Sequence, residues 1–273
     1  MKMHDVEAHV DGFRHSVDII AESGVNPRYS SPVVDAYEHL APIIDTDQYM
    51  GWIRDRALSL GARLLTERIH GSVIDKESAL LARFSATAII NCTGLAAAEL
   101  AGDSTCYPLR GALVRVINDG CRFPRITSAM AISLDGREGK QDMVFIVPRN
   151  DNTLILGGLV EPNQWDLNIN LDNYPPIKAM YDRCLEFYEP LRKFQVDPDY
   201  PVAVGLRPLR KTNVRVEREP TSVYRGRRSR IVHSYGHGGA GFSLSFGCAT
   251  DVADIVDKIV AEVEADRQVM ARM

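Results

Sequence analysis

A glycine cluster near the C-terminal end is the part of the sequence best suited to hold a ligand. The run Gly236-His237-Gly238-Gly239-Ala240-Gly241 has the spacing G-x-G-x-x-G, follows a predicted strand and opens a predicted helix. Glycines at such a junction let a planar or phosphorylated ligand approach the backbone, and the helix N-terminus offers N–H groups and partial positive charge. A ligand that becomes anionic during turnover would be stabilised there. The alternative is a tight turn that allows close packing of helix and sheet.

The same cluster does not predict a complete dinucleotide-binding unit. The full fingerprint needs a second parallel strand and an acidic residue about twenty residues further on. The sequence has 273 residues, so 32 follow Gly241, and their apolar pattern is that of one helix. We therefore expect no Rossmann unit at this position.

Two other segments carry residue types with possible chemistry. The run Leu206-Arg207-Pro208-Leu209-Arg210-Lys211 contains two arginines, and arginine suits bidentate binding of a carboxylate. For an arginine in an arbitrary β-rich segment, a surface role is the alternative. The run Asn91-Cys92-Thr93-Gly94 ends an apolar strand, where open α/β sheets usually bind their ligands.

The elements that must position these segments alternate between helices and short strands. Apolar periodicity, with Asp45 as a capping residue, predicts helices at 45–60, 96–100, 176–191 and 241–270. Short apolar and β-branched runs predict strands at 62–68, 86–92, 112–116, 143–147, 153–156, 200–204, 214–217 and 230–235, with a hairpin loop at 148–152. This order predicts a mixed α/β fold with a β-rich insertion between two parts of an α/β layer.

Composition narrows the possible partners. Lysine and arginine total 32 against 36 acidic residues, a net charge of -4, which argues against nucleic acid and anionic membranes as partners. Five scattered cysteines form no C-x-x-C pair, so we expect a reducing compartment and no metal site. The sequence shows no signal peptide and no apolar stretch long enough to span a bilayer. We expect a soluble protein.

Taken in chain order, the motifs resemble the D-amino acid oxidase family, which includes D-aspartate oxidases. The resemblance runs from about Asp45 to the C-terminal end. It rests on five segments in the family's order: 91–94, 110–111, 156–158 with Trp165 downstream, 205–210 and 233–241. It implies a truncated FAD-binding α/β domain at 1–105 and 222–273, with an inserted antiparallel β-rich substrate domain at 106–221.

The resemblance also implies an activity and a site. The family binds FAD non-covalently and passes hydride from a D-amino acid to the flavin, giving an imine or keto acid and hydrogen peroxide. A related small amine or carboxylate is an equally open substrate. Arg210 would pair with the substrate carboxylate, and no catalytic residue is identified. The residues that would contact FAD are Ile69, Thr93, Gly94, Gly238, Gly239, Ala240, Gly241, Phe242 and Ser243.

Three departures from the family pattern put parts of this site in doubt. No βαβ unit with its own G-x-G-x-x-G precedes Asp45, so we expect this chain alone to bind FAD weakly or not at all. The family's carboxylate-binding tyrosine corresponds to Phe145, which cannot donate a hydrogen bond, and its lid tyrosine corresponds to Gln141. We nevertheless expect removal of the Arg210 side chain to weaken ligand binding with little effect on stability, because a ligand-facing arginine has no other buried partner.

These departures leave three hypotheses open. The first is an FAD-dependent oxidase whose N-terminal unit lies on a second polypeptide or was lost, and exposed strand edges also favour a partner chain or a homodimer. The second is a flavin-free binding or structural protein. The third is an enzyme that uses the pocket without redox chemistry. The end Ala271-Arg272-Met273 resembles a variant of the S-K-L peroxisomal address, so the expected location is cytoplasmic or peroxisomal.

Overall fold

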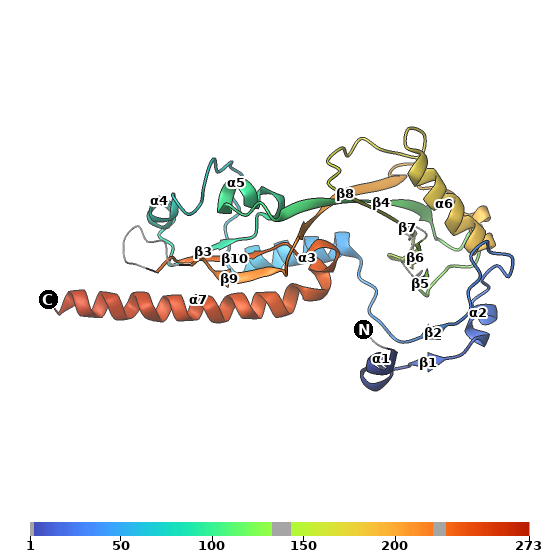
Figure 1. Ribbon diagram of the computed structural model, residues 1–273, viewed down its shortest axis with the longest axis horizontal. Helices are drawn as coiled ribbons and strands as arrows, with labels where there is room; N and C mark the ends of the chain where they lie inside the picture. The colour runs from blue at the N-terminus through green and yellow to red at the C-terminus, as the bar shows by residue number, and fades with distance from the viewer. Residues whose placement is uncertain (1–2, 133–142, 221–227, 273) are drawn as a thin grey trace. The chain divides into compact units, whose positions relative to one another are not determined.

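The computed structural model describes residues 3–132, 143–220 and 228–272 (Figure 1). Helices alternate with parallel and antiparallel strands, which confirms the predicted mixed α/β class. The chain divides into two compact units, each described here by itself. The first unit comprises Met1–Leu64, Gly111–Val160 and Asp166–Gly205, and the second comprises Leu65–Arg110, Glu161–Trp165 and Leu206–Met273. The domain boundaries expected at 105/106 and 221/222 stay a prediction.

A five-stranded sheet supplies the core of the first unit. The sheet has the order β5-β6-β7-β4-β8, and its strands are β4 (Cys106–Ile117), β5 (Met130–Ile132), β6 (Val144–Pro148), β7 (Thr153–Pro162) and β8 (Val202–Arg210). The pairs β5–β6 and β6–β7 are antiparallel, and the hairpin loop predicted at 148–152 is confirmed between β6 and β7. Alternate residues of β4 and β6 are buried because successive side chains point to opposite faces of a sheet.

Helix α6 (Pro175–Phe187) covers this sheet with an apolar face. Ile177, Met180 and Cys184 are fully buried in the same cluster as Val144, Ile146 and Leu156 of the sheet. The helix is shorter than the predicted 176–191. Pro190 lacks the N–H that an α-helix would need, and residues Glu189–Lys193 form a separate 3₁₀ turn, η3.

The N-terminal part of the first unit consists of short elements. These are α1 (Met3–His9), β1 (Arg14–His15), α2 (Asp18–Glu22) and β2 (Tyr37–Glu38), followed by α3 (Thr46–Ser59). The Asp45 side chain accepts hydrogen bonds from the backbone N–H groups of Asp47 and Gln48, so it caps α3 as predicted. Asn150 donates a further hydrogen bond to Asp45, at 2.9 Å.

The second unit is built on a three-stranded sheet of order β3-β10-β9. Its strands are β3 (Ile89–Asn91), β9 (Arg215–Arg218) and β10 (Ile231–Tyr235). Strand β10 is parallel to β3 and antiparallel to β9. The parallel pair agrees with the continuous apolar run around residue 89, a pattern typical of parallel strands.

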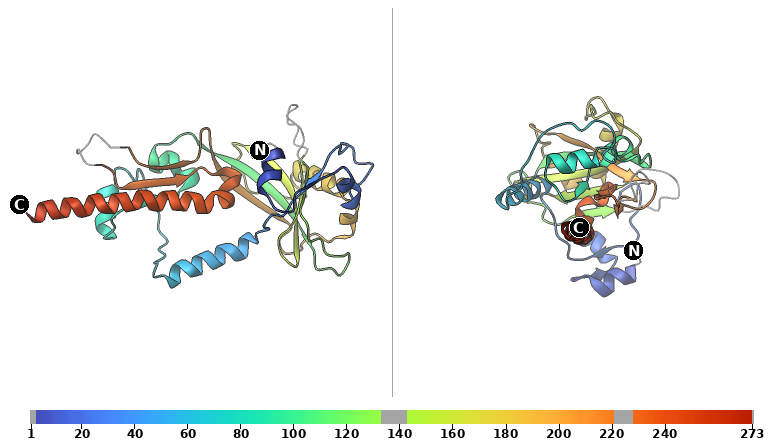
Figure 2. Two further views of the ribbon diagram at one scale, coloured as in Figure 1. Left: turned by 90° about the horizontal axis from the view of Figure 1, so that it is seen from below. Right: turned by 90° about the vertical axis from the view of Figure 1, so that its left-hand side faces the viewer.

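Helices flank this small sheet. The long helix α7 (Gly241–Ala271) runs beside β9 and β10 in both Figure 1 and Figure 2. Its residues Val252 and Ile259 are buried against Val232, as the predicted apolar stripe requires. The short helix α4 (Glu77–Arg83) precedes β3 in the chain, and the short helix α5 (Ala97–Ala101) comes after it. Leu100 of α5 packs with Val73 and Ile231 in a separate cluster.

One predicted strand is wrong. Residues 62–68 belong to no strand, and all of them are exposed. Their alternation of polar and apolar side chains is compatible with a strand, but a strand also needs a partner for its backbone groups. Within the described residues, no neighbouring strand pairs with this segment.

Candidate functional site

Two of the motifs meet because β3 and β10 are parallel. Asn91 lies opposite His233 in the register of the two strands, so the chain leaves both strands at the same edge of the sheet. At this edge lie Thr93 and Gly94, which follow β3, and the segment 236–241, which follows β10 and continues through the 3₁₀ turn η4 (Gly238–Ala240) into α7. The carboxyl ends of parallel strands are where open α/β sheets bind ligands.

The third motif, at the end of β8, lies against both of these segments. Leu209 forms a backbone bridge with His237. A Cβ atom on Gly94 would lie 3.3 Å from Pro208, and a Cβ atom on Gly238 would lie 2.6 Å from the Leu209 side chain. The three segments singled out by the sequence are therefore in contact within the second unit.

The glycines of the cluster divide into two groups by what surrounds them. Gly236 and Gly238 have φ of +86° and +55°, and a Cβ on either would come within 2.6 Å of β8 side chains. A side chain there would be strained and would collide, so packing alone explains these two glycines. Gly239 and Gly241 have no atom closer than 3.8 Å to an added Cβ, and Gly239 is exposed. Only the second group leaves backbone open to a ligand.

This division predicts different outcomes for two alanine substitutions. Gly238→Ala is expected to lower the free energy of unfolding by about 2 kcal/mol, because it adds a collision to a left-handed conformation. Gly239→Ala is expected to change it by less than about 0.5 kcal/mol. Chemical denaturation of both variants checks this, and equal losses of stability in the two would contradict the division.

Arg210 already binds a carboxylate of its own chain. Its Nε lies 2.9 Å from Oδ2 of Asp103, and its Nη1 donates to the carbonyl oxygen of Asn213 at 2.7 Å. The Arg210 and Asp103 side chains are only 16% and 7% exposed. Burial by itself would raise the pKa of Asp103, but hydrogen bonds from Thr105 and Tyr235 and the charge of Arg210 lower it. The expectation that Arg210 has no buried partner is wrong, and its binding of a substrate carboxylate stays a prediction.

Arg207, three residues earlier on β8, is in the opposite situation. Its Nη1 atom is buried and has no hydrogen-bond partner among the residues that the structure describes. Burial lowers the pKa of the Arg207 guanidinium, yet arginine remains protonated at neutral pH. The Cδ atom of Arg207 is the closest neighbour, at 3.8 Å, of a Cβ placed on Gly239. An unpaired, partly desolvated cation therefore lies beside the open part of the glycine cluster.

The sequence motif contains both arginines, and the family resemblance predicts Arg210 as the one that binds the substrate carboxylate. The spacing of the two arginines cannot separate them, because either could face a ligand from a strand end. Side chains three positions apart on a strand point to opposite faces and so meet different neighbours. The distinguishing partner is Asp103, which is more than a hundred positions away in the chain.

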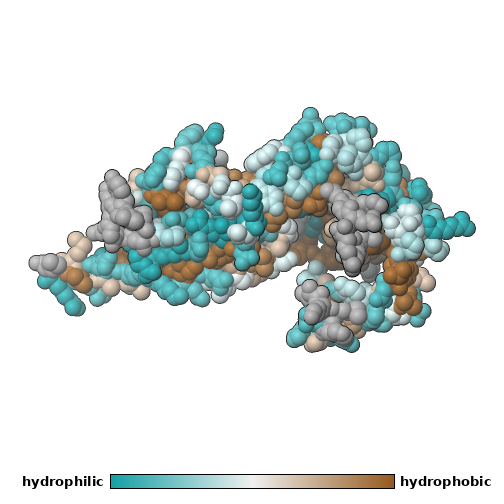
Figure 3. Space-filling view, viewed as in Figure 1, coloured by the Kyte–Doolittle hydropathy of each residue, from teal (hydrophilic) through white to brown (hydrophobic). Residues whose placement is uncertain are grey.

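Other predicted site residues lie in several places. Thr93, Phe242 and Ser243 are exposed in the second unit, as is Ile69, which is 36% exposed and outside any helix or strand. Hydrophobic surface also runs along α7 in Figure 3. Phe145 lies in the first unit, on β6, where it is opposite Gly157. Gln141 lies outside the described residues, and the roles of all these residues stay predictions.

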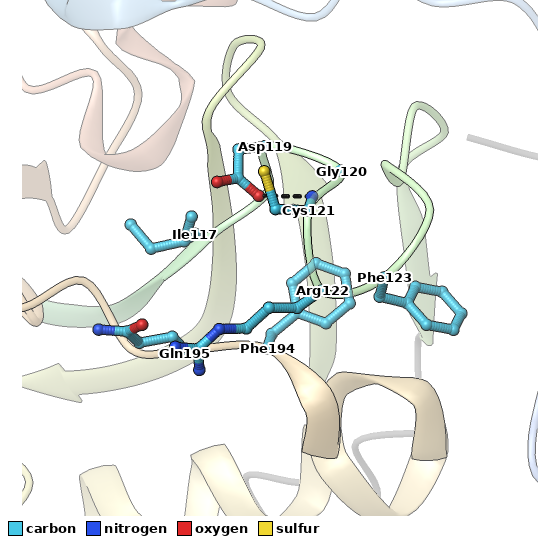
Figure 4. Close-up of a pocket in the computed structure, with 8 residues that line it drawn as sticks. All are labelled: Ile117, Asp119, Gly120, Cys121, Arg122, Phe123, Phe194 and Gln195. Carbon is cyan, nitrogen blue, oxygen red and sulfur yellow. Dashed lines mark hydrogen bonds between the residues drawn. The ribbon is translucent and has the colours of Figure 1, made fainter.

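The first unit has a small pocket of its own (Figure 4). Its volume is about 210 Å³, and it is lined by Ile117, Asp119, Gly120, Cys121, Arg122, Phe123, Phe194 and Gln195. The Asp119 carboxylate accepts the backbone N–H of Cys121 at 2.8 Å, an interaction that shapes the turn. None of the predicted site residues lines this pocket.

Comparisons with known proteins are consistent with this site. The protein-family model described as FAD dependent oxidoreductase matches residues 14–255. The D-amino-acid oxidase of Streptomyces coelicolor is 33% identical over 213 residues, which are 78% of this chain and 57% of that protein. The D-amino-acid oxidase of Dictyostelium discoideum is 31% identical over 224 residues, which are 79% and 54% of the two chains. The chain thus spans about half the length of the curated relatives that it matches.

A solved structure shows the same fold. The L-proline dehydrogenase from P. horikoshii superimposes with a TM-score of 0.59 at 14% sequence identity, covering 92% of this chain and 64% of that one. Among the residues that the structure describes, no helix combines the length and the hydropathy needed to cross a membrane.

Proposed function

The chain belongs to the FAD-dependent oxidoreductase family, whose cofactor is FAD, and we propose that it carries the flavin-ring and carboxylate-binding part of a D-amino acid oxidase. The reaction would oxidise the D-amino acid to an imine, which water would hydrolyse to a keto acid and ammonia. Molecular oxygen would accept the two electrons and become hydrogen peroxide. Similarity to the two D-amino-acid oxidases supports this substrate class. Phe145 and Gln141 stand where the family has tyrosines, and we propose that these two differences change which substrates are accepted.

The observation that carries this proposal is the position of Arg207. Arg207 is half-buried, and a partly desolvated cation with a buried, unpaired Nη1 atom is costly for a folded protein unless a ligand supplies an anion. The carboxylate of an amino acid has the charge and the bidentate geometry that a guanidinium binds best. Because Arg207 lies beside Gly239, a carboxylate bound to it would be held next to the exposed backbone of the glycine cluster.

The residues present fit the flavin part of FAD. Gly239 and Gly241 leave the backbone open over the start of α7, and Thr93 is exposed at the neighbouring strand end. These residues would hold the planar ring, and the N-terminus of α7 would favour negative charge on it. When bound, FAD supplies a hydride acceptor. The chain's own contribution is then to bind the substrate carboxylate through Arg207 and to orient the Cα–H bond toward the ring.

We further propose that this chain needs a second polypeptide segment, from a partner chain or a second copy, for tight FAD binding. The support is that the matched region covers 47% and 54% of two curated D-amino-acid oxidases, about half of each. We also propose a peroxisomal location, supported by the similarity of Ala271-Arg272-Met273 to the S-K-L address. Met273 lies outside the described residues.

Titration of the purified chain with FAD, followed by flavin fluorescence and absorbance, tests the cofactor site. We expect weak binding, with a dissociation constant above about 10 µM for the chain alone. Gly239→Val is expected to weaken this binding at least tenfold, because its side chain would occupy the open backbone face. Gly51→Val on α3 is the matched control, since a Cβ there meets no atom within 4 Å and a Cβ on Gly239 meets none closer than 3.8 Å.

Addition of D- and L-amino acids to the FAD-loaded chain, with peroxide detection, then tests the reaction. Peroxide formed from D-amino acids and abolished by Arg207→Gln supports the proposal. Equal FAD affinity of the Gly239→Val variant and the wild type would show that the flavin does not bind at the glycine cluster. Loss of binding in both glycine variants would point instead to general damage by valine.

A further inference from the structure

A chain of hydrogen bonds runs from Thr93, at the candidate site, into the interior of the second unit. The Thr93 hydroxyl donates to Oδ1 of Asn91 at 2.7 Å, and Nδ2 of Asn91 is 3.1 Å from Nδ1 of His233. Nε2 of His233 is 2.7 Å from Oε2 of Glu219. Asn91 and His233 are 3% and 0% exposed, so water cannot replace these contacts.

In this series of hydrogen bonds, the groups at the two ends, Thr93 and Glu219, fix which atom donates in each bond. The backbone N–H of Thr93 also donates to Oδ1 of Asn91, at 3.1 Å, so the amide cannot be reversed without placing two donors together. The amide nitrogen of Asn91 must then donate to Nδ1 of His233. The ring proton of neutral His233 is therefore on Nε2, where Glu219 accepts it.

The far end is held by a charged group. Nη2 of Arg215 donates to the same oxygen of Glu219, at 3.1 Å, which keeps this carboxylate an acceptor. Nη1 of Arg215 donates to the hydroxyl of Tyr235, whose ring packs edge-on against His233. Burial, together with the charge of Arg215, lowers the pKa of His233, although Glu219 and Glu217 act in the opposite direction. His233 is thus neutral at pH 7.

This arrangement decides what Thr93 can offer to a ligand. A threonine hydroxyl has one proton to donate and lone pairs that accept. The proton is already given to Asn91, while Thr93 itself is exposed beside the glycine cluster. Toward a ligand, the hydroxyl can therefore act only as an acceptor.

We propose that Asn91, His233 and Glu219 are positioning residues that hold Thr93 as a hydrogen-bond acceptor, so that the ligand of the glycine cluster must present a donor there, such as an N–H group. The identity of that ligand as a flavin rests on the proposed function, and the oxidised flavin ring carries one such N–H. The hydrogen-bond chain itself does not depend on the ligand.

The substitution Glu219→Leu should reverse the hydrogen-bond chain. Leucine removes the acceptor of the His233 Nε2–H group, and Arg215 cannot replace it because a guanidinium only donates. The ring proton then finds an acceptor only from Nδ1, where the Asn91 amide must turn to accept it, and Thr93 loses its acceptor. Glu219→Gln is the control that should keep the hydrogen-bond chain, because one glutamine oxygen can accept from both His233 and Arg215, as Oε2 of Glu219 does.

Nitrogen NMR of the full chain with labelled histidine tests the inference without any ligand. The wild type is expected to show His233 protonated on Nε2 and the Thr93 hydroxyl proton in slow exchange with water. Glu219→Leu is expected to shift the His233 proton to Nδ1 and to bring the Thr93 hydroxyl into fast exchange, whereas Glu219→Gln is expected to leave both as in the wild type. A wild-type ring protonated on Nδ1, or a Glu219→Leu variant with an unchanged ring, would overturn the inference.

FAD titration then tests the consequence for the ligand. Thr93→Val, at the exposed end of the chain, keeps the shape of the side chain and is expected to weaken FAD binding about fivefold to tenfold. Thr93→Ser keeps the hydroxyl and is expected to bind as the wild type does. Equal affinity of Thr93→Val and the wild type would overturn the role toward the ligand. Absence of FAD binding by every form, with the expected NMR results, would refute the proposed function and leave the positioning of Thr93 intact. If Glu219→Leu does not fold, the Thr93 pair and the wild-type spectrum still decide.

Discussion

Arg210→Ala is expected to lower the free energy of unfolding by about 3 kcal/mol. The substitution leaves the Asp103 carboxylate buried without its cation, since that side chain is only 7% exposed and Arg210 is its ion-pair partner at 2.9 Å. Tyr235 and Thr105 would still donate to Asp103, which limits the loss. Urea denaturation of the variant and the wild type measures the difference.

A double-mutant cycle isolates the ion pair from other effects. Asp103→Asn removes the charge that Arg210 pairs with, so Arg210→Ala in that background is expected to cost clearly less than in the wild type. A loss below about 0.5 kcal/mol for the single variant Arg210→Ala would show that the pair does not support the fold. Arg210 would then be available to a ligand, as the sequence suggested.

Arg207→Gln is expected to weaken binding of the substrate carboxylate by about 2–4 kcal/mol, roughly 30-fold to 1000-fold. The reason is loss of a charge-assisted pair in a partly desolvated place. The free energy of unfolding is expected to stay within about 0.5 kcal/mol of the wild-type value or to rise. The substitution removes a positive charge whose buried Nη1 atom has no hydrogen-bond partner among the described residues. Calorimetric titration of D-amino acids in the presence of FAD measures the affinity.

Two control variants test whether the loss of affinity in Arg207→Gln comes from the guanidinium of Arg207. Arg207→Lys keeps the charge but not the fork of donors, and it is expected to bind with intermediate affinity. Asp103→Asn frees Arg210 from its ion pair, so a gain in carboxylate affinity in that variant would show that Arg210 can take over. Unchanged affinity in Arg207→Gln would refute the assignment of the anchor to Arg207.

Features set by near neighbours in the chain could be read from the sequence. Asp45 caps α3, the apolar stripe of α7 faces β10, and the loop at 148–152 joins two strands, all as predicted. Caps, periodicity and turns depend on residues only a few positions apart, so the printed order of residues contains the needed information. The location of the glycine cluster between a strand and a helix is a local property of the same kind.

Features that depend on distant residues needed the tertiary structure. Segment 62–68 has the pattern of a strand but no partner in the described residues, and a pattern does not supply a partner. Asn91 and His233 become neighbours only through the parallel register of β3 and β10. By itself, the sequence predicted a site made of an arginine-bearing strand end and a glycine cluster, and this stays a prediction. Which arginine is left without a partner was decided by Asp103, because an ion pair forms between groups that the fold brings together, whatever their separation along the chain.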